Sequence, residues 1–313
     1  MLARGPAVVL DARATGRAVP AFTVYTLESI RAVCEAAERT SLPVILQAGS
    51  SSYRETSRSM LAAAALAAAR DASVSVGVHL DHSTDLEEIR DCISLGYTSV
   101  MVDGSHLKFA ENVALTRAVV AQAHDVGVWV EAELGALAGD EDASTGVASG
   151  ELTDPAQAAE FVDSTGVDVL AAAVGTVHGF TRSPVHVDLE RVEMIAKQTG
   201  VPQALHGASG LSNADLIAAV KAGIAKVNIN AELRRAYLST LAAELPNVAT
   251  TSVCCSVKRS PRWLRSRRRS LLSSAGMVRE RMIDEPSRLD RPGRDGPSDG
   301  RQRGARRARR HRI

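Results

Sequence analysis

Eight alternations of strand and helix within residues 1–250 constrain the fold more than any other feature of this sequence. The runs that read as strands are short, rich in β-branched and apolar residues, and often apolar on both faces, as buried parallel strands are. We predict strands at Val19–Tyr25, Pro43–Gly49, Ser75–His82, Ser99–Asp103, Val128–Gly135, Val167–Gly175, Val201–His206 and Lys226–Asn230. A longer pattern with helical periodicity follows each one, which predicts helices at Leu27–Thr40, Arg54–Asp71, Asp85–Leu95, Ala110–Val126, Pro155–Thr165, Leu189–Thr199, Asn213–Ala222 and Ala231–Leu245.

Residues typical of helix ends support this order. Thr84 with Glu87 and Ser212 with Asp215 have the spacing of capping boxes, and Pro155 directly follows an aspartate suited to an N-cap. A glycine suited to a left-handed C-cap follows five of the helices, at Gly96, Gly127, Gly166, Gly200 and Gly223. Eight units in about 230 residues predict an α/β protein whose parallel sheet closes into a (β/α)8 TIM barrel. A doubly wound open sheet is the alternative.

The last part of the chain differs in composition from everything before it. Residues 251–313 carry 19 Lys and Arg against 6 Asp and Glu, whereas the first 250 residues carry 18 against 30. Residues 258–313 are rich in Arg, Ser, Gly, Pro and Asp and show no sustained apolar periodicity, so they cannot bury enough surface to offset chain entropy. We therefore predict a barrel over residues 1–250 and a largely disordered, basic C-terminal tail over residues 251–313.

No segment predicts export or membrane insertion. The apolar stretch Ala7–Leu10 is too short for a secretory signal, and the Ala-rich run Leu61–Ala69 is too short to span a bilayer. The four cysteines show neither the density of a disulfide framework nor a CxxC spacing, which fits thiols in a reducing compartment. We expect a soluble, cytoplasmic protein with no membrane partner.

Polar residues gather at the predicted C-terminal ends of the strands, the face where barrel enzymes build their active sites. His82, His178 and His206 follow three non-adjacent strands, and Asp81 supplies a carboxylate beside the first of them. One such histidine is more often a structural residue. Three at equivalent positions favour a catalytic zinc site, which has three protein ligands and an open position.

A joint pattern of seven segments runs along the same region. The segments are Ala18–Phe22, Leu80–His82, Met101–His106, Val130–Gly135, Gly175–Gly179, Leu205–Ser209 and Lys226–Leu233. In this order they resemble the zinc-dependent class II fructose-bisphosphate and tagatose-bisphosphate aldolases. The resemblance covers about residues 1–245 and leaves the last part of the chain unmatched.

The resemblance implies a metal centre and two groups that transfer protons. The zinc ligands it implies are His82, His178 and His206, with Asp103 and Glu133 around the metal at an alternative position. Asp81 takes the C4-hydroxyl proton during cleavage and returns it during condensation. Glu141 handles the proton at the carbon of the triose enediolate, although this residue alone reads as an exposed loop acid.

The chemistry of aldol cleavage agrees with a metal route. Cleaving a β-hydroxy ketone needs an electron sink at the carbonyl, which zinc supplies as a Lewis acid. Other aldolases use a buried strand lysine that forms a Schiff base. Of the lysines before residue 250, Lys108, Lys197 and Lys221 fall in predicted loops or helices, and Lys226 opens the eighth predicted strand at the end away from the active face.

Phosphate binding is also implied by the resemblance. The phosphate and triose contacts are Gly179, Gly207, Ser209, Asn228 and Asn230, and Ser50 binds the other phosphate. Small residues at strand ends let backbone N–H groups approach an anion, although a glycine there is more often a tight turn. The family also places a monovalent cation, Na+ or K+, near this phosphate and forms homodimers or homotetramers.

Two positions depart from the family pattern. Thr23 stands where the family has Asn, and Ala231 stands where it has the phosphate-binding Thr of the eighth strand. Losing one hydroxyl contact to a phosphate costs on the order of 1 to 3 kcal/mol of binding, which raises KM more than it lowers turnover.

Two functions remain open at this point. The first is cleavage of a tagatose or fructose 1,6-bisphosphate into dihydroxyacetone phosphate and glyceraldehyde 3-phosphate, with the short loops closer to the tagatose-type branch. The second is a catalytically impaired barrel whose basic tail binds nucleic acid. Apart from Trp263, the tail has no aromatic residue interleaved with its basic ones, and it has no known reading motif, which disfavours a nucleic-acid partner.

Overall fold

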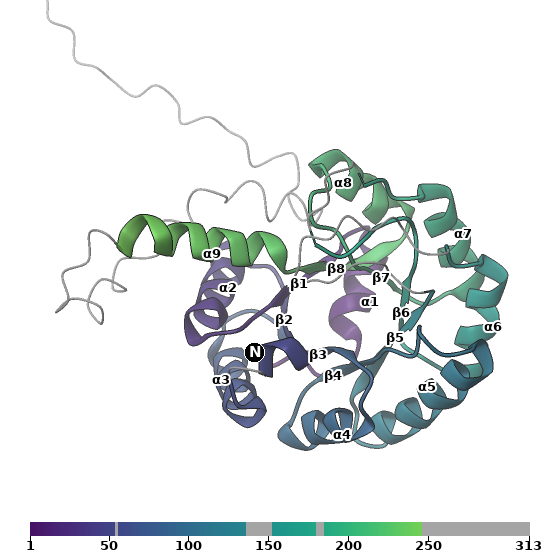
Figure 1. Cartoon of the computed structure of the whole chain (residues 1–313), viewed down its shortest axis with the longest axis horizontal. Helices are drawn as coiled ribbons and strands as arrows, with labels where there is room; N and C mark the ends of the chain where they lie inside the picture. The colour runs from purple at the N-terminus through teal and green to yellow at the C-terminus, as the bar shows by residue number, and fades with distance from the viewer. Residues whose placement is uncertain (54–55, 136–151, 180–184, 246–313) are drawn as a thin grey trace, which may run out of the picture. The chain divides into compact units, whose positions relative to one another are not determined.

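The computed structural model describes residues 1–53, 56–135, 152–179 and 185–245. All of them lie in the first of two compact units, Met1–Val278 and Arg279–Ile313. Eight parallel strands pair in sequence order and β8 pairs with β1, so the sheet closes into a barrel (Figure 1). The strands are β1 Val19–Thr23, β2 Val44–Gly49, β3 Val76–Ser83, β4 Ser99–Val102, β5 Trp129–Leu134, β6 Val169–Ala172, β7 Gln203–Leu205 and β8 Ile224–Ile229. The predicted TIM barrel is confirmed.

Helices surround the barrel in the predicted alternation. They are α2 Leu27–Thr40, α3 Arg58–Asp71, α4 Leu86–Leu95, α5 Phe109–His124, α6 Pro155–Thr165, α7 Leu189–Thr199, α8 Asn213–Ala222 and α9 Ala231–Glu244. The bounds of α2, α6, α7 and α8 are those predicted from sequence. Helix α3 begins four residues later than predicted, and the 3-10 turn η1, Ser50–Tyr53, follows β2.

The helix caps show which predictions of helix ends from the local sequence are correct. The Ser212 hydroxyl accepts from the Asp215 N–H, and Asp154 caps α6 ahead of Pro155, as predicted. The prediction of a Thr84 cap for α4 is wrong, because the N-cap is Asp85, whose carboxylate accepts from the Glu87 N–H at 2.8 Å. The C-cap of α5 is Asp125, so Gly127 follows the helix and does not cap it.

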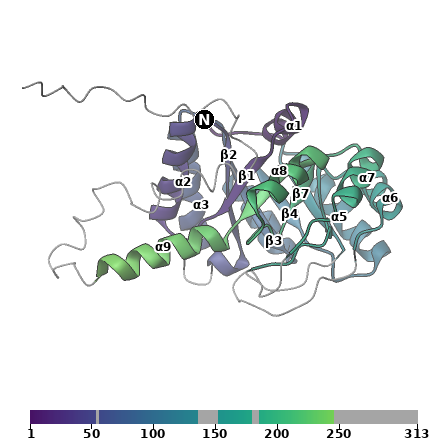
Figure 2. The same ribbon diagram turned by 90° about the horizontal axis from the view of Figure 1, so that it is seen from above.

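One helix was missed. Helix α1, Ala7–Ala14, buries Val8, Val9 and Ala12 against the strands, and lies at one end of the barrel (Figures 1 and 2). It packs on β1 and β8, and its buried side chains form a cluster with apolar residues inside the barrel, among them Val19 and Trp129 at the starts of their strands. The N-terminal end of the barrel is therefore closed by apolar packing.

A second, larger cluster fills the layer between the strands and the surrounding helices and makes up most of the core. Within the described part of the chain, no helix combines the length and the apolar character that crossing a bilayer requires.

Candidate active site

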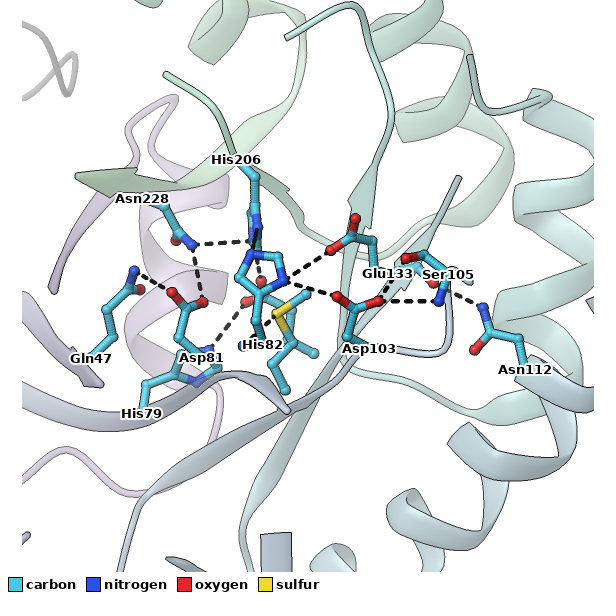
Figure 3. Close-up of polar contacts among 12 residues, drawn as sticks. Gln47, His79, Asp81, His82, Asp103, Ser105, Asn112, Glu133, His206 and Asn228 are labelled. Carbon is cyan, nitrogen blue, oxygen red and sulfur yellow. Dashed lines mark hydrogen bonds and ion pairs between the residues drawn. The ribbon is translucent and has the colours of Figure 1, made fainter. Parts of the chain in front are cut away.

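A local irregularity in β3 brings two consecutive side chains to the site. Side chains alternate between the two faces of a strand, so Asp81 and His82 would normally point in opposite directions. The pairing of β3 with β4 shifts register between Leu80 and Ser83, and His82 has a φ of 43°, in the left-handed region. A bulge of this kind re-aims side chains. Here it places both Asp81 and His82 at the C-terminal end of the barrel (Figure 3).

The three predicted histidine ligands come together. His82 lies on β3, His178 follows β6 and His206 follows β7, and ring nitrogens of all three lie within 4.8 Å of one another. His206 Nδ1 is 2.8 Å from His82 Nε2. Burial, and then the charge of His82, lower the pKa of His178 to about 3, so this imidazole stays neutral and keeps a lone pair at neutral pH.

Asp103 and Glu133 form a second group around the other nitrogen of His82. His82 Nδ1 lies 3.0 Å from Asp103 Oδ2 and 3.3 Å from Glu133 Oε2, and the three residues meet the same distance criterion for metal ligands (Figure 3). Burial raises the pKa of Asp103, but the hydrogen bond and charge of His82 and the bonds from Ser105 outweigh it and hold the pKa below its usual range. His82 is shared between two groups of possible ligands.

The Asp81 carboxylate is buried and held by two amides. Gln47 donates to Oδ2 at 2.8 Å and Asn228 donates to Oδ1 at 3.1 Å (Figure 3). Burial raises the pKa of Asp81, but the charges of His82 and Lys226 outweigh this effect, so the pKa lies below its ordinary value. Asp81 is therefore ionised at neutral pH, in the state in which a carboxylate accepts a proton.

A layer of charged residues beneath the histidines was not predicted. Lys226 lies within β8 and not at its start, since the strand begins at Ile224, and its side chain is completely buried. Lys226 Nζ lies 2.9 Å from Glu131 Oε2 and donates to Asn228 Oδ1 at 2.7 Å. Glu131 Oε1 lies 2.7 Å from His206 Nε2. An ammonium group held by these contacts is not a free amine nucleophile. Lys226 is therefore still excluded as a Schiff-base lysine, but because of its contacts and not because of its predicted position at the start of the strand.

Five of the predicted substrate contacts line one small pocket. They are Gly179, Gly207, Ser209, Asn228 and Asn230, joined by Ala208 and Ala231. Gly207 has a φ of +64°, and a Cβ there would lie 2.5 Å from the Val177 carbonyl oxygen, so only glycine fits this turn. The Ser209 hydroxyl donates to Glu232 at 2.9 Å.

The remaining predicted site residues lie elsewhere. Ser50 follows β2, and its hydroxyl donates to Glu88 Oε2 at 2.7 Å. Glu141 lies outside the described residues. Thr23, which replaces the family's Asn, accepts a hydrogen bond from Gln47 at 3.1 Å and so adjoins the amide that holds Asp81.

The donor set fits a zinc ion. Carboxylates accept hydrogen bonds from His206 Nε2 and His82 Nδ1, which assigns the ring hydrogens to these atoms and leaves lone pairs on the two nitrogens that face each other at 2.8 Å. Two lone pairs at this distance repel unless a cation or a proton lies between them. Three imidazoles are a common zinc-binding set, and carboxylate partners orient such ligands.

The fold and this site together define a barrel with a candidate metal site at the C-terminal ends of its strands. Comparison with known families is consistent with it, since the family described as fructose-bisphosphate aldolase class-II matches residues 5–282. The protein belongs to the class II fructose-bisphosphate aldolase family, whose members depend on zinc. The match extends past residue 250, where composition placed the predicted domain boundary.

Solved structures agree with this assignment. The chain is similar to the YdjI aldolase from Escherichia coli K12, with 33% identity, a TM-score of 0.78, and coverage of 88% of this chain and 98% of that one. It is also similar to a protein from Coccidioides immitis described as a candidate fructose-1,6-bisphosphate aldolase, with 32% identity, a TM-score of 0.78, and coverage of 88% and 96%. A fructose-bisphosphate aldolase from Campylobacter jejuni, at 22% identity, a TM-score of 0.67 and coverage of 88% and 96%, shares the fold.

Proposed function

We propose that this enzyme reversibly cleaves a ketose 1,6-bisphosphate into dihydroxyacetone phosphate and glyceraldehyde 3-phosphate, with zinc held by His82, His178 and His206. The observation that carries the proposal is the convergence of these three imidazoles, beside the buried carboxylate of Asp81, at one end of the barrel. When bound, zinc supplies Lewis acidity at the carbonyl and hydroxyl oxygens of the substrate.

The proton transfers fall to two carboxylates. Asp81 takes the C4-hydroxyl proton during cleavage, and the amides of Gln47 and Asn228 fix the direction of its two oxygens. Because both amides donate to it, the ionised form of Asp81 is the one the site favours. We assign the proton at the carbon of the triose enediolate to Glu141, following the family resemblance.

Substrate binding uses the two sides of the barrel end. We propose that the pocket formed by Gly179, Gly207, Ser209, Asn228 and Asn230 takes the phosphate and triose, with Na+ or K+ nearby. Ser50 then takes the second phosphate after releasing Glu88, its present acceptor. Asp103 and Glu133 offer the zinc its alternative position around His82.

The finer identity of the substrate, and of the assembly, is also part of the proposal. Fructose and tagatose bisphosphates differ only at C4, the carbon whose hydroxyl Asp81 deprotonates. We expect tagatose 1,6-bisphosphate to be preferred and the protein to form a homodimer or homotetramer. Coupled assays with each sugar bisphosphate, and light scattering of the full chain, measure both.

The metal centre is tested by His206→Ala in the full-length protein. We expect about one zinc per chain in the unmodified protein and loss of both zinc and cleavage in the variant, as a three-ligand site requires. His124→Ala is a matched control, since His124 pairs with Asp168 on the outside of the barrel and should keep both. Full zinc content and unchanged turnover in His206→Ala would remove this histidine from the site.

Zinc content and cleavage activity, together with retention on DNA, distinguish the aldolase from the second candidate function. The excess of Lys and Arg over residues 251–313, which we propose as a separate basic region, is the observation that favours nucleic-acid binding. Salt-sensitive retention on DNA by a protein without zinc or cleavage activity would support that alternative and contradict the aldolase.

The phosphate pocket is tested by restoring the family's hydroxyl with Ala231→Thr. Ala231 lines the pocket at the start of α9, so the added hydroxyl should lower KM about tenfold, about 1.4 kcal/mol, with little change in kcat. Ala242→Thr, on the exposed part of α9, provides the control for the cost of threonine in this helix. An unchanged KM in both variants would place the phosphate elsewhere.

A further inference from the structure

We propose that the buried pair Lys226 and Glu131 positions both functional halves of the site: Glu131 fixes the ring of His206, and Lys226 fixes the amide that holds Asp81. The two are positioning residues and do not touch the substrate. The inference rests on the metal centre proposed above. It concerns which nitrogen of His206 carries the ring hydrogen and which way the Asn228 amide is turned.

The pair lies deep in the barrel and has no contact with solvent. Lys226 on β8 and Glu131 on β5 have fully buried side chains, with Nζ and Oε2 2.9 Å apart. Buried ion pairs are costly to form and are often replaceable by apolar residues without loss of stability. Stability alone is therefore a weak reason for a Lys–Glu pair at this position, and its remaining contacts show a more specific role.

The first role concerns His206. One oxygen of the Glu131 carboxylate lies 2.7 Å from His206 Nε2, and the other lies 2.9 Å from the Lys226 ammonium. An ionised carboxylate only accepts, so Nε2 carries the ring hydrogen and Nδ1 keeps its lone pair. The amide nitrogen of Asn228 also lies near Nε2, at 3.3 Å, but the shorter contact with a charged acceptor decides the assignment.

The second role concerns Asp81. An ammonium only donates, so the 2.7 Å bond from Lys226 requires the Asn228 amide to present its oxygen to the lysine. The nitrogen of the same amide then faces Asp81 Oδ1 at 3.1 Å. A reversed amide would place its oxygen against the Asp81 carboxylate. One buried cation thus turns the donor group of Asn228 toward Asp81 and, by pairing with Glu131, keeps a carboxylate acceptor beside His206.

The variant Glu131→Gln, which keeps the shape of the side chain and removes its charge, tests the first role. With Lys226 present, the new amide turns its oxygen to the lysine and its NH2 group to His206. His206 Nε2 then becomes an acceptor, the ring hydrogen moves to Nδ1, and the lone pair for the metal is lost. We expect the affinity for Zn²⁺ and Co²⁺ to fall about 10- to 100-fold, the usual effect of removing a partner of a ligand histidine.

The double variant Glu131→Gln with Lys226→Met provides a rescue. Without the ammonium, the oxygen of the introduced amide is free to accept from His206, so metal affinity should recover at least fivefold relative to Glu131→Gln alone. Lys226→Met alone keeps Glu131 as acceptor, and because the Asn228 amide is no longer fixed, it should lower kcat more than it changes KM. Methionine has a similar shape, and the double variant buries no unpaired charge.

The measurements are metal competition against a chromophoric chelator, the visible spectrum of the Co²⁺ protein, and chemical unfolding of each metal-free variant. Asp168→Asn is the matched control, because Asp168 is also a carboxylate paired with a histidine, His124 at 2.8 Å, and it directly precedes β6, at the end of the barrel away from these three histidines. It should leave metal affinity and the Co²⁺ spectrum unchanged.

The outcomes separate this inference from the proposed function. Absence of metal binding by the unmodified protein would overturn the zinc site, and the inference with it. Normal metal binding by the unmodified protein with undiminished affinity in Glu131→Gln would overturn the inference alone. Equal weakening in Glu131→Gln and the double variant, in proportion to their loss of stability, would show a structural role and also overturn it.

Discussion

The two ends of the barrel differ although the same strands build both. At the closed end α1 packs Val9 against small and apolar side chains, and at the open end histidines and carboxylates of the described residues gather. Strand β5 shows the gradient on its inward positions, which change from Trp129 to Glu131 to Glu133 along the chain. Stability is concentrated at one end of each strand and chemistry at the other, in agreement with the general division of labour in TIM barrels.

The layer between the two ends combines the burial of the closed end with the polar contacts of the open end. Lys226, Glu131 and His79 are fully buried, as the apolar residues below them are, yet they contact the polar groups above. His79 stacks on Trp129 with ring centroids 5.3 Å apart, which joins this layer to the closed end. Changes at the three levels should therefore have separable effects on turnover, on pH-dependent stability and on stability alone.

The largest effect is expected at the open end, from Asp81→Asn. The isosteric amide keeps the volume but cannot accept the C4-hydroxyl proton, so turnover should fall by roughly a hundredfold or more, while zinc content and unfolding midpoint change little. Steady-state kinetics and metal analysis on one preparation measure the split. A comparable loss of zinc would mean that Asp81 maintains the centre and does not act in proton transfer.

The middle layer should determine part of the response to acid. Burial, and then the charge of Lys226, lower the pKa of His79 to about 3, against about 6.5 in an unfolded chain. A depressed histidine pKa means that the unfolded state binds more protons between these values, so stability is present above pH ~6.5 and is lost as pH falls toward ~3.

The variant His79→Gln should flatten that dependence. The slope of the free energy of unfolding of the metal-free protein should decrease by up to one proton, about 1.4 kcal/mol per pH unit, between pH ~6.5 and ~3. Urea titrations at several pH values measure it, with His124→Gln on the outer surface as the control. An unchanged slope would contradict a neutral, buried His79.

The smallest effect on function is expected at the closed end, from Val9→Ala. Val9 is fully buried under the barrel, so removing two methyl groups should lower the free energy of unfolding by about 1 to 3 kcal/mol while kcat, KM and zinc affinity stay the same. The neighbouring Leu10→Ala is the control, because Leu10 is 45% exposed and should cost under about 0.5 kcal/mol. Altered kinetics in Val9→Ala would show that the two ends are coupled.

The sequence by itself determined the order of the elements and the composition of the open end. Period-two and helical patterns are local, so they located eight strands and the exact bounds of α2, α6, α7 and α8. The rule that the C-terminal ends of parallel strands lie on one face of a barrel then predicted that His82, His178 and His206 lie together. The short helix α1 was missed because eight residues are too few to show a helical period, and its stability depends on the barrel beneath it.

Only the tertiary structure decided how the site is held. The bulge that turns both Asp81 and His82 into the barrel arises from the pairing of β3 with β4, which no local pattern encodes. The depth of Lys226 in the barrel follows from the true start of β8 at Ile224, two residues before it. Its partner Glu131 is 95 residues away in sequence, and such a pair forms because closing the barrel removes both charges from water and leaves each as the other's counter-ion.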